Sequence, residues 1–304
     1  MTDVATRYYL HGNSQIEIAR DLGLDPSTIS RHLKRARDDG IVRVEIVPPR
    51  RKNVELGLAL TRRYDLGRAV VAEPGDEDAD PIAAVASVAA DFIADQLRRG
   101  MRVGIGWGQT LAAVVAKLAP GVVSEIQVSQ LAGGLADAES GIQGHELARM
   151  LVQIYPDSRA TYLHAPSIVD SQAICDALLA DRSIQAALAA AAQTEVALVG
   201  IGEIDPGATL LTASHILGAE RDALIGEGAI GSMNGRFYDR AGRPAGHLDR
   251  RTVALEWRAL AAIPTVIAVA AGAAKVAAIG AALRTGCVTV LVTDEPTAEA
   301  LIAG

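Results

Sequence analysis

Residues 104–111 read GIGWGQTL, in which three glycines surround Trp107. Glycine lets a ligand approach the main chain closely, and Gln109 and Thr110 add side chains that hydrogen-bond polar groups. The stretch lies between the apolar run MRV and the helical pattern AAVVAKL. Because the first N–H groups of a helix carry the positive end of its dipole, this strand-to-helix turn predicts an anion site, with phosphate as the expected anion.

Two well-known phosphate motifs do not fit this turn. The Gly-Lys-Ser/Thr of a Walker loop is missing, and the glycines lack both the final spacing and the following acidic residue of a dinucleotide fingerprint. A tight strand-to-helix turn that binds nothing is the alternative.

Other polar or glycine-rich stretches follow expected strands. They are QLAGGL (130–135), GIGEI (200–204), the polar loop MNGRFYDRAGRP (233–244), which carries Asn234, Arg236 and Asp239, and AGAAK (271–275). The last places Lys275 in the first turns of an expected helix, where a cation opposes the helix dipole. We therefore expect an anion beside Lys275, and a solvated lysine is the alternative.

These stretches need a scaffold that brings them together. From Val54 onward, short β-branched runs alternate with helical patterns, which predicts a parallel sheet covered by helices on both faces. The expected strands are 69–71, 102–105, 125–130, 196–199, 266–270 and 288–292. The expected helices are 82–99, 111–118, 144–154, 171–179, 184–192, 273–283 and 297–302. Ligands in such sheets bind outside the carboxyl ends of the strands.

Residues 14–38 have the pattern of a helix–turn–helix. Ser14 and Glu17 have the spacing of a capping box, and Gly23 is expected to end the first helix. Asp25 or Ser27 is expected to cap the second helix, with Pro26 in its first turn. The expected apolar positions are Ile16, Ala19 and Leu22 in the first helix, Leu24 in the turn, and Ile29, Leu33 and Ala36 in the second helix.

The outer face of the second helix combines short hydroxyl side chains with basic ones, which is typical of a recognition helix in a major groove. The run IVRVEIV (41–47) alternates and predicts a strand of a small wing. The predicted DNA contacts are Ser27, Thr28, Ser30, Arg31, Lys34, Arg35 and Arg43. An ordinary helical hairpin with a solvated basic face is the alternative.

Charge divides the chain in the same way. The net charge is −7, yet residues 1–52 are basic, so the negative charge belongs to the remainder. The stretch PPRRKN (48–53) has the composition of a basic linker. We therefore expect a helix–turn–helix domain with its linker at 1–52 and a second, separate domain at 53–304.

Composition also limits the class of protein. Cys175 and Cys287 are the two cysteines, and both lie in apolar stretches, as expected of small buried side chains in a reducing compartment. No apolar run is long enough for a membrane helix, and the six histidines have no metal-ligand spacing. We therefore expect a cytoplasmic protein with no membrane partner, no metal and no cofactor.

The order and spacing of these blocks resemble the SorC family of bacterial transcriptional regulators over nearly the whole chain. The blocks are SQIEIARDLGLDPSTISRHLKRARDDGIVRV, GIGWGQTL, QLAGG, APSIV, GEGAIGSMNGRFYDRAGRP, IPTVIAVAAGAAKVAAIGAALRTG and VTVLVTDE. The resemblance implies a winged helix–turn–helix followed by a Rossmann-like, sugar-phosphate isomerase-like domain. It implies that this second domain, at 53–304, is the effector-binding and oligomerisation domain. It also implies a homo-oligomer, typically a tetramer, that binds double-stranded operator DNA and responds to a phosphorylated sugar or polyol.

The resemblance also implies roles for individual residues. The phosphate-binding turn is expected at Gly106, Trp107, Gly108, Gln109 and Thr110. Gln130, Gly133 and Gly134 are expected to line the sugar site, Asp239 to accept hydrogen bonds from ligand hydroxyls, and Lys275 to pair with phosphate or a ligand oxygen. Asn234 is also expected to be an effector-binding residue. One branch of the family forms a Schiff base through a lysine where this chain has Ala132, so a non-covalent effector is expected here.

Two other functions remain as alternatives. A sugar-phosphate isomerase or deaminase with an accessory helix–turn–helix would need a base, for which Glu203, Asp205, Asp239 and His215 are the candidates. A purely architectural DNA-binding oligomer would leave the polar strand ends unexplained. The sequence leaves open whether a regulator of this kind represses or activates.

Overall fold

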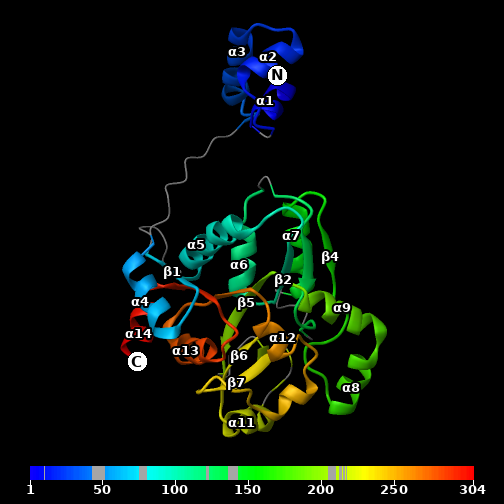
Figure 1. The fold of residues 1–304 in the computed structure, drawn as a ribbon, viewed down its shortest axis with the longest axis vertical. Helices are drawn as coiled ribbons and strands as arrows, with labels where there is room; N and C mark the ends of the chain where they lie inside the picture. The colour runs from blue at the N-terminus through cyan, green and yellow to red at the C-terminus, as the bar shows by residue number, and fades with distance from the viewer. Residues whose placement is uncertain are drawn as a thin grey trace. The chain divides into compact units, whose positions relative to one another are not determined.

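The computed structural model describes residues 1–9, 11–42, 52–74, 81–120, 123–135, 143–204, 210–211, 214, 216 and 218–304. Residues 43–47 of the expected wing strand, including Arg43, and the candidate bases Asp205 and His215 lie outside these residues. The chain divides into two compact units, Met1–Pro49 and Arg50–Gly304 (Figure 1). Each unit has its own hydrophobic core.

The first unit contains three described helices, α1 (Thr2–Tyr9), α2 (Gln15–Leu22) and α3 (Pro26–Asp38). Both halves of the predicted capping box form between Ser14 and Glu17, and Gly23 ends α2 with a φ of 64°. Asp25 caps α3 through the Ser27 N–H, and Pro26 occupies its first turn. The local sequence therefore fixes both ends of α2 and the start of α3.

The core of this unit differs from the expected one in part. Ile29, Leu33 and Ala36 of α3 are buried as predicted. In α2, however, Ile18 is buried beside Ala19, whereas Ile16 is 64% exposed. Ile16 lies two residues before Ile18 and thus on the opposite face of α2. Leu24, expected in the turn, is also exposed, because Val4 and Ala5 of the unpredicted helix α1 complete the core.

The second unit is built on a parallel sheet with the strand order β1-β9-β8-β5-β2-β3-β4. Its strands are β1 (Arg68–Ala72), β2 (Arg102–Ile105), β3 (Gln127–Gln130), β4 (Arg159–Thr161), β5 (Val196–Glu203), β8 (Thr265–Val269) and β9 (Val290–Asp294). A strand occurs at each of the six expected positions. β3 begins two residues late because Glu125 has a φ of 62°, which extended strands do not adopt.

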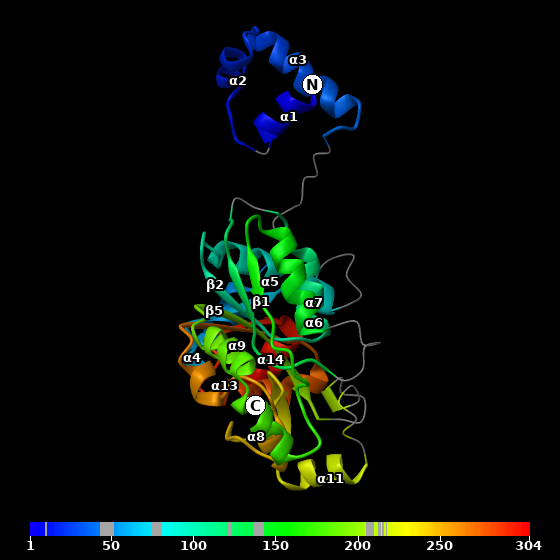
Figure 2. The same cartoon turned by 90° about the vertical axis from the view of Figure 1, so that its right-hand side faces the viewer.

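Helices cover both faces of this sheet. The helices described in this unit are α4 (Val54–Tyr64), α5 (Pro81–Gln96), α6 (Gln109–Lys117), α7 (Gly144–Ile154), α8 (Gln172–Ala180), α9 (Arg182–Ala192), α11 (Ala219–Gly226), α12 (Trp257–Ala261), α13 (Val276–Arg284) and α14 (Glu295–Ala303), with 3₁₀ turns η2 (His247–Arg251) and η3 (Ala273–Lys275). On one face, α5, α6 and α7 lie side by side (Figures 1 and 2). On the other, α4, α12, α13 and α14 contribute to a second core cluster.

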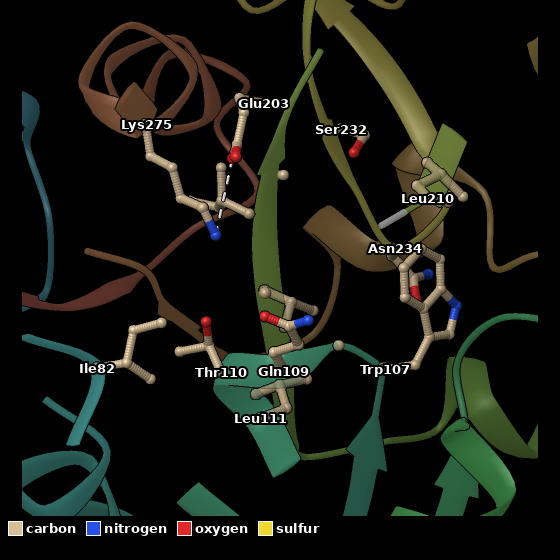
Figure 3. A pocket seen from close by; sticks show the side chains of 17 residues that line it. Ile82, Trp107, Gln109, Thr110, Leu111, Glu203, Leu210, Ser232, Asn234 and Lys275 are labelled. Carbon is tan, nitrogen blue, oxygen red and sulfur yellow. Dashed lines mark ion pairs between the residues drawn. The ribbon is translucent and has the colours of Figure 1, made fainter. Parts of the chain in front are cut away.

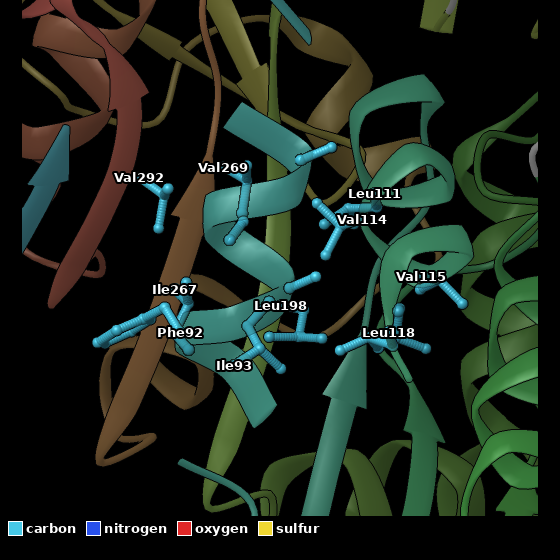
Figure 4. Packing of buried hydrophobic residues seen from close by; sticks show 14 of the residues in the cluster. Phe92, Ile93, Leu111, Val114, Val115, Leu118, Leu198, Ile267, Val269 and Val292 are labelled. Atoms are coloured by element: carbon cyan, nitrogen blue, oxygen red, sulfur yellow. The ribbon is translucent and has the colours of Figure 1, made fainter. Parts of the chain in front are cut away.

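The packing of α5 and α6 on the sheet fixes the start of α6. Ile93 of α5 and Leu111 and Val114 of α6 are fully buried against Leu198 of β5 and Val269 of β8 (Figure 4). Leu111 lies in the first turn of α6, together with Gln109 and Thr110 of GWGQT. Because Leu111 is buried in this core, the core fixes the position of that helical turn.

The sequence did not predict one strand pair, which bears on the site. Residues 229–239, part of which was expected to be a polar loop, form a hairpin of β6 (Ala229–Met233) and β7 (Arg236–Asp239). The hairpin pairs antiparallel with the end of β5, Ile201 opposite Met233. The dipeptide Asn234-Gly235 forms its turn, and both residues have positive φ, 54° and 78°. Asn-Gly between two strands is the usual signal for such a turn.

Within the residues described, no helix is long and apolar enough to cross a membrane.

Candidate effector site

The turn GWGQT connects β2 to α6. Gly108 has φ 124° and ψ 162°, a backbone conformation restricted to glycine, and it directly precedes α6. Among the described residues, no side chain caps the N-terminus of α6. Its first N–H groups therefore remain available to a ligand, with the positive end of the helix dipole behind them.

A cavity opens at this turn, at the carboxyl end of the central strands (Figure 3). Its wall combines the turn, the end of β5, the β6–β7 hairpin and η3. The lining residues are Ile82, Gly106, Trp107, Gly108, Gln109, Thr110, Leu111, Val199, Gly200, Ile201, Gly202, Glu203, Leu210, Ser232, Asn234, Gly235 and Lys275. Seven predicted effector residues thus lie together, namely Gly106, Trp107, Gly108, Gln109, Thr110, Asn234 and Lys275.

Lys275 faces Glu203 across one end of this cavity. Its Nζ lies 3.7 Å from Oε2 of Glu203, and both side chains are about a quarter exposed (Figure 3). Lys275 ends η3 and directly precedes α13, so it stands at a helix start, where a cation needs a negative partner. Glu203 supplies part of that charge.

Three buried polar atoms of the wall have no hydrogen-bond partner in the described part of the chain. They are Nε1 of Trp107, Oδ1 of Asn234 and Oε2 of Glu203, whose contact with Lys275 is longer than a hydrogen bond. A buried polar atom left unsatisfied costs about 1–3 kcal/mol. Three of them on one cavity mark positions where a polar ligand fits.

The remaining predicted effector residues do not line this cavity. The buried Gln130 donates from Nε2 to the Ala132 carbonyl and accepts at Oε1 from the Leu163 N–H. A Cβ atom on Gly133 would lie 2.5 Å from the Pro166 carbonyl oxygen, so this glycine permits close packing of two chain segments. Gln130 and Gly134 line a second, separate cavity with His145, Arg149, Tyr162, Leu163 and His164.

Asp239 also lies away from the cavity, contrary to its expected role. Its carboxylate accepts from the Ala241 N–H and from the backbone and side chain of Arg243, each at 2.9 Å. The backbone hydrogen bond from Arg243, followed by its side-chain hydrogen bond, lowers the pKa of Asp239. This carboxylate therefore closes its own turn at the end of β7. Its loop neighbour Arg236 is likewise structural, because it is buried and pairs with Asp249 at 2.7 Å.

Two further polar side chains of the cavity wall, Glu203 and Ser232, are not predicted as effector residues from the sequence. Glu203 is predicted only as part of the strand-end stretch GIGEI and as a candidate base for an enzyme, and Ser232 lies in the unpredicted strand β6. The Asn-Gly turn signal would have revealed the hairpin and placed Ser232 beside the end of β5. Groups of three or more His, Cys, Asp or Glu suited to a metal are absent from the described residues.

The first unit presents a basic helix face. Ser27, Ser30, Lys34 and Arg35 are exposed on α3. The exposed Arg31 donates to the Thr28 hydroxyl at 3.1 Å, and Arg35 pairs with Asp39 at 3.3 Å. These contacts lie on the surface, where ion pairs are weak, so both guanidinium groups remain available to phosphates.

Comparisons with known proteins agree with this architecture. A family profile described as "Winged helix-turn-helix DNA-binding" matches residues 12–43, and one described as "Putative sugar-binding domain" matches residues 49–303. Together the two profiles account for most of the chain.

Full-length relatives are regulators. The chain is 28% identical to the deoxyribonucleoside regulator of Bacillus subtilis, covering 99% of this chain and 96% of that protein. It is 31% identical to the transcriptional regulator LsrR of Klebsiella pneumoniae, covering 99% and 91%. The crystal structure of the full-length sorbitol operon regulator SorC from Klebsiella pneumoniae superposes with a TM-score of 0.77 at 27% identity, covering 99% and 97%. The enzyme alternative is thereby set aside, and the chain belongs to the SorC family of sugar-binding transcriptional regulators.

Proposed function

We propose that this protein regulates transcription of a carbohydrate or polyol catabolic operon in response to a phosphorylated, sugar-type effector. The effector binds without a covalent bond in the cavity between the N-terminus of α6 and Lys275. The observation that carries this proposal is the combination of an uncapped helix start and three unsatisfied polar atoms on one cavity wall. The names of the relatives, which include regulators of sorbitol and deoxyribonucleoside genes, support the sugar-related class.

The charges of the cavity support an orientation for this ligand. Gln109 and Thr110 begin α6, where N–H groups, the dipole and the Thr110 hydroxyl all favour a phosphate. Glu203 repels an anion at the other end, but it accepts hydrogen bonds from hydroxyl groups. We therefore assign the phosphate to the end of the cavity at the α6 N-terminus, within reach of the flexible Lys275 ammonium. The hydroxylated part of the effector is assigned to the end of the cavity at Glu203.

Residues 1–52 serve in this proposal as the DNA-binding domain, and residues 53–304 bind the effector and form the oligomer. The resemblance to the SorC family supports a homo-oligomer, with a tetramer as the expected state. An oligomer presents several recognition helices to repeated half-sites of an operator, which strengthens binding through linkage of the sites.

One run of contacts supports transmission of effector binding to the linker. The Gly272 N–H, just before η3, donates to the Thr297 hydroxyl at 2.9 Å. In the same first turn of α14, Glu295 accepts from Nδ2 of Asn53 at 2.6 Å. Asn53 in turn caps α4 and is the last residue of the basic linker stretch 48–53. The first turn of α14 thus hydrogen-bonds both to the segment that carries Lys275 and to the segment that leads into α4.

A DNA-binding assay on the full chain tests this function. Operator DNA is selected from a random double-stranded pool, and its affinity is measured with and without sugar phosphates. We expect one of these ligands to change the operator affinity, in either direction. Lys275→Ala should remove the response and leave ligand-free DNA binding intact, and Arg31→Ala should weaken DNA binding and leave ligand binding intact. Selection of no sequence, or a response unchanged in Lys275→Ala, would contradict the proposal.

A further inference from the structure

The side-chain amide of Asn234 has a fixed orientation. The residue is 7% exposed and lies in the tight β6–β7 turn with a positive φ. Its Nδ2 donates to the Leu131 carbonyl at 3.1 Å. A flipped amide would place Oδ1 against that carbonyl oxygen, so the assignment of the two atoms is settled by repulsion between acceptors. Oδ1 therefore remains an acceptor without a partner among the described residues.

Trp107 offers the complementary group in the same wall. Its Nε1–H is a pure donor, buried and without a partner in the described ranges. A Cβ built on Gly106 would lie 3.7 Å from Oδ1 of Asn234, and one built on Gly235 would lie 4.0 Å from Cζ2 of Trp107. The Asn234 amide thus lies beside the residue that precedes Trp107, and the indole lies beside the residue that follows Asn234, so both line the same part of the cavity wall (Figure 3).

The chemistry of these two atoms selects the group that satisfies them. A phosphate or carboxylate oxygen accepts from Trp107 but repels Oδ1 of Asn234. An ammonium group donates to Asn234 but leaves Trp107 unsatisfied. A hydroxyl group both accepts and donates, whereas a carbon that carries only hydrogen satisfies neither atom.

We infer that Trp107 and Asn234 recognise a hydroxyl group of the effector, so that the protein discriminates against the analogue that is deoxy at that one carbon. This inference rests on the proposed function and narrows its ligand to hydroxylated sugar or polyol phosphates. A site built to hydrogen-bond a hydroxyl rejects the analogue that lacks it, because its buried polar atoms are left unpaired. The expected loss of affinity is about ten- to a hundred-fold.

The test uses calorimetric titration of the full chain. A panel of four- to six-carbon sugar and polyol phosphates identifies the tightest binder, which is then compared with each of its monodeoxy forms. We expect one monodeoxy form to bind about ten- to a hundred-fold more weakly than its parent. Trp107→Phe and Asn234→Gly should each bring the ratio of parent to monodeoxy affinity close to one, because each weakens binding of the parent alone. Phenylalanine keeps a ring in place, and glycine tolerates the positive φ of residue 234.

Trp257→Phe is the matched control. The Trp257 indole nitrogen is also buried without a partner in the part of the chain that the structure describes, but it does not line this cavity. Trp257→Phe should show the same ratio of parent to monodeoxy affinity as the unmodified chain. The inference would be overturned if every monodeoxy form bound as tightly as the parent, or if Trp107→Phe discriminated between the two as the unmodified chain does. In either case, binding of the parent sugar phosphate would still uphold the proposed function. Failure of every phosphate to bind would overturn both.

Discussion

At the scale of single residues, the cavity depends on backbone geometry as much as on side chains. Gly108 holds a conformation that only glycine adopts readily, and this conformation directs the chain into α6. Asn234 adopts a positive φ that asparagine tolerates better than most residues. These two positions set where the α6 N–H groups and the Asn234 amide lie. The glycines of the turn were recognisable in the sequence, but the pairing of Lys275 with Glu203 was not, since 71 residues separate them.

Gly108→Ala should destabilise the protein because it forces a Cβ into the φ 124° conformation. The expected cost is about 1–3 kcal/mol in the free energy of unfolding, the usual range for such strain. Thermal or urea unfolding of the full chain measures it.

Gly226→Ala is the control for this substitution. Gly226 ends α11 with an ordinary φ, and a Cβ there would contact nothing within 4 Å. This variant should be as stable as the unmodified chain or slightly more so, because alanine favours a helix. A Gly108→Ala chain that unfolds no more easily than this control would refute the strain at the turn.

At the scale of elements, the sequence predicted what local chemistry determines. Caps and turn residues marked α2 and α3, and apolar periodicity marked the strands of the central sheet. The sequence did not predict the strands whose formation depends on tertiary contacts. β4 has three residues at the edge of the sheet, and β6 reads AIGSM, with no alternation of apolar and polar residues. Both form because neighbouring strands supply hydrogen-bond partners. Ser232 and Asn234 could not be placed together at the site without that hairpin.

The N-cap of α3 gives a pH-dependent prediction at this scale. The carboxylate of Asp25 accepts from the Ser27 N–H at 2.8 Å, and hydrogen bonds from Ser27 lower the pKa of Asp25. A pKa lowered in the folded state means that the stabilisation is complete above the unfolded value of about 3.9. It is lost as the pH falls through the lower, folded value.

Asp25→Ala should therefore melt at a lower temperature than the unmodified chain at neutral pH, and the difference should shrink in acid. Helical circular dichroism measured from pH 7 to pH 3 follows both chains. Asp38→Ala, a change at the exposed last residue of α3, serves as the comparison. A melting difference for Asp25→Ala that does not change with pH would mean that the charged cap contributes nothing to the helix.

At the scale of the whole molecule, two units of different charge and architecture are joined by a basic stretch. The contacts from Gly272 through Thr297 and Glu295 to Asn53 connect the ligand-facing turn with the last residue of that stretch. Allosteric control requires that ligand binding favours one of two states that differ in DNA affinity. The short turn at the start of α14 is placed to take part in that change.

Glu295→Gln should weaken the coupling between effector and operator without removing either binding event. The amide keeps the size of the side chain but loses the charge that strengthens the hydrogen bond from Asn53. We expect the effector-induced change in operator affinity to fall several-fold, while each ligand binds its own site as before. Fluorescence anisotropy of labelled operator, with and without effector, gives this ratio.

Glu299 is exposed on the same helix, and Glu299→Gln should leave the ratio of operator affinities with and without effector unchanged. Equal coupling in the Glu295 and Glu299 variants would exclude the α14 turn from the transmission.

The most direct test of the central claim is the thermal stability of the full chain against sugar phosphates, each paired with its unphosphorylated sugar or polyol. A ligand at a hundred times its dissociation constant stabilises the folded state by about 2.7 kcal/mol, which raises the melting temperature measurably. We predict a shift with a phosphorylated member alone, and its loss in Lys275→Ala. A shift with the unphosphorylated partner alone would contradict the account and leave GWGQT as a tight turn without an anion.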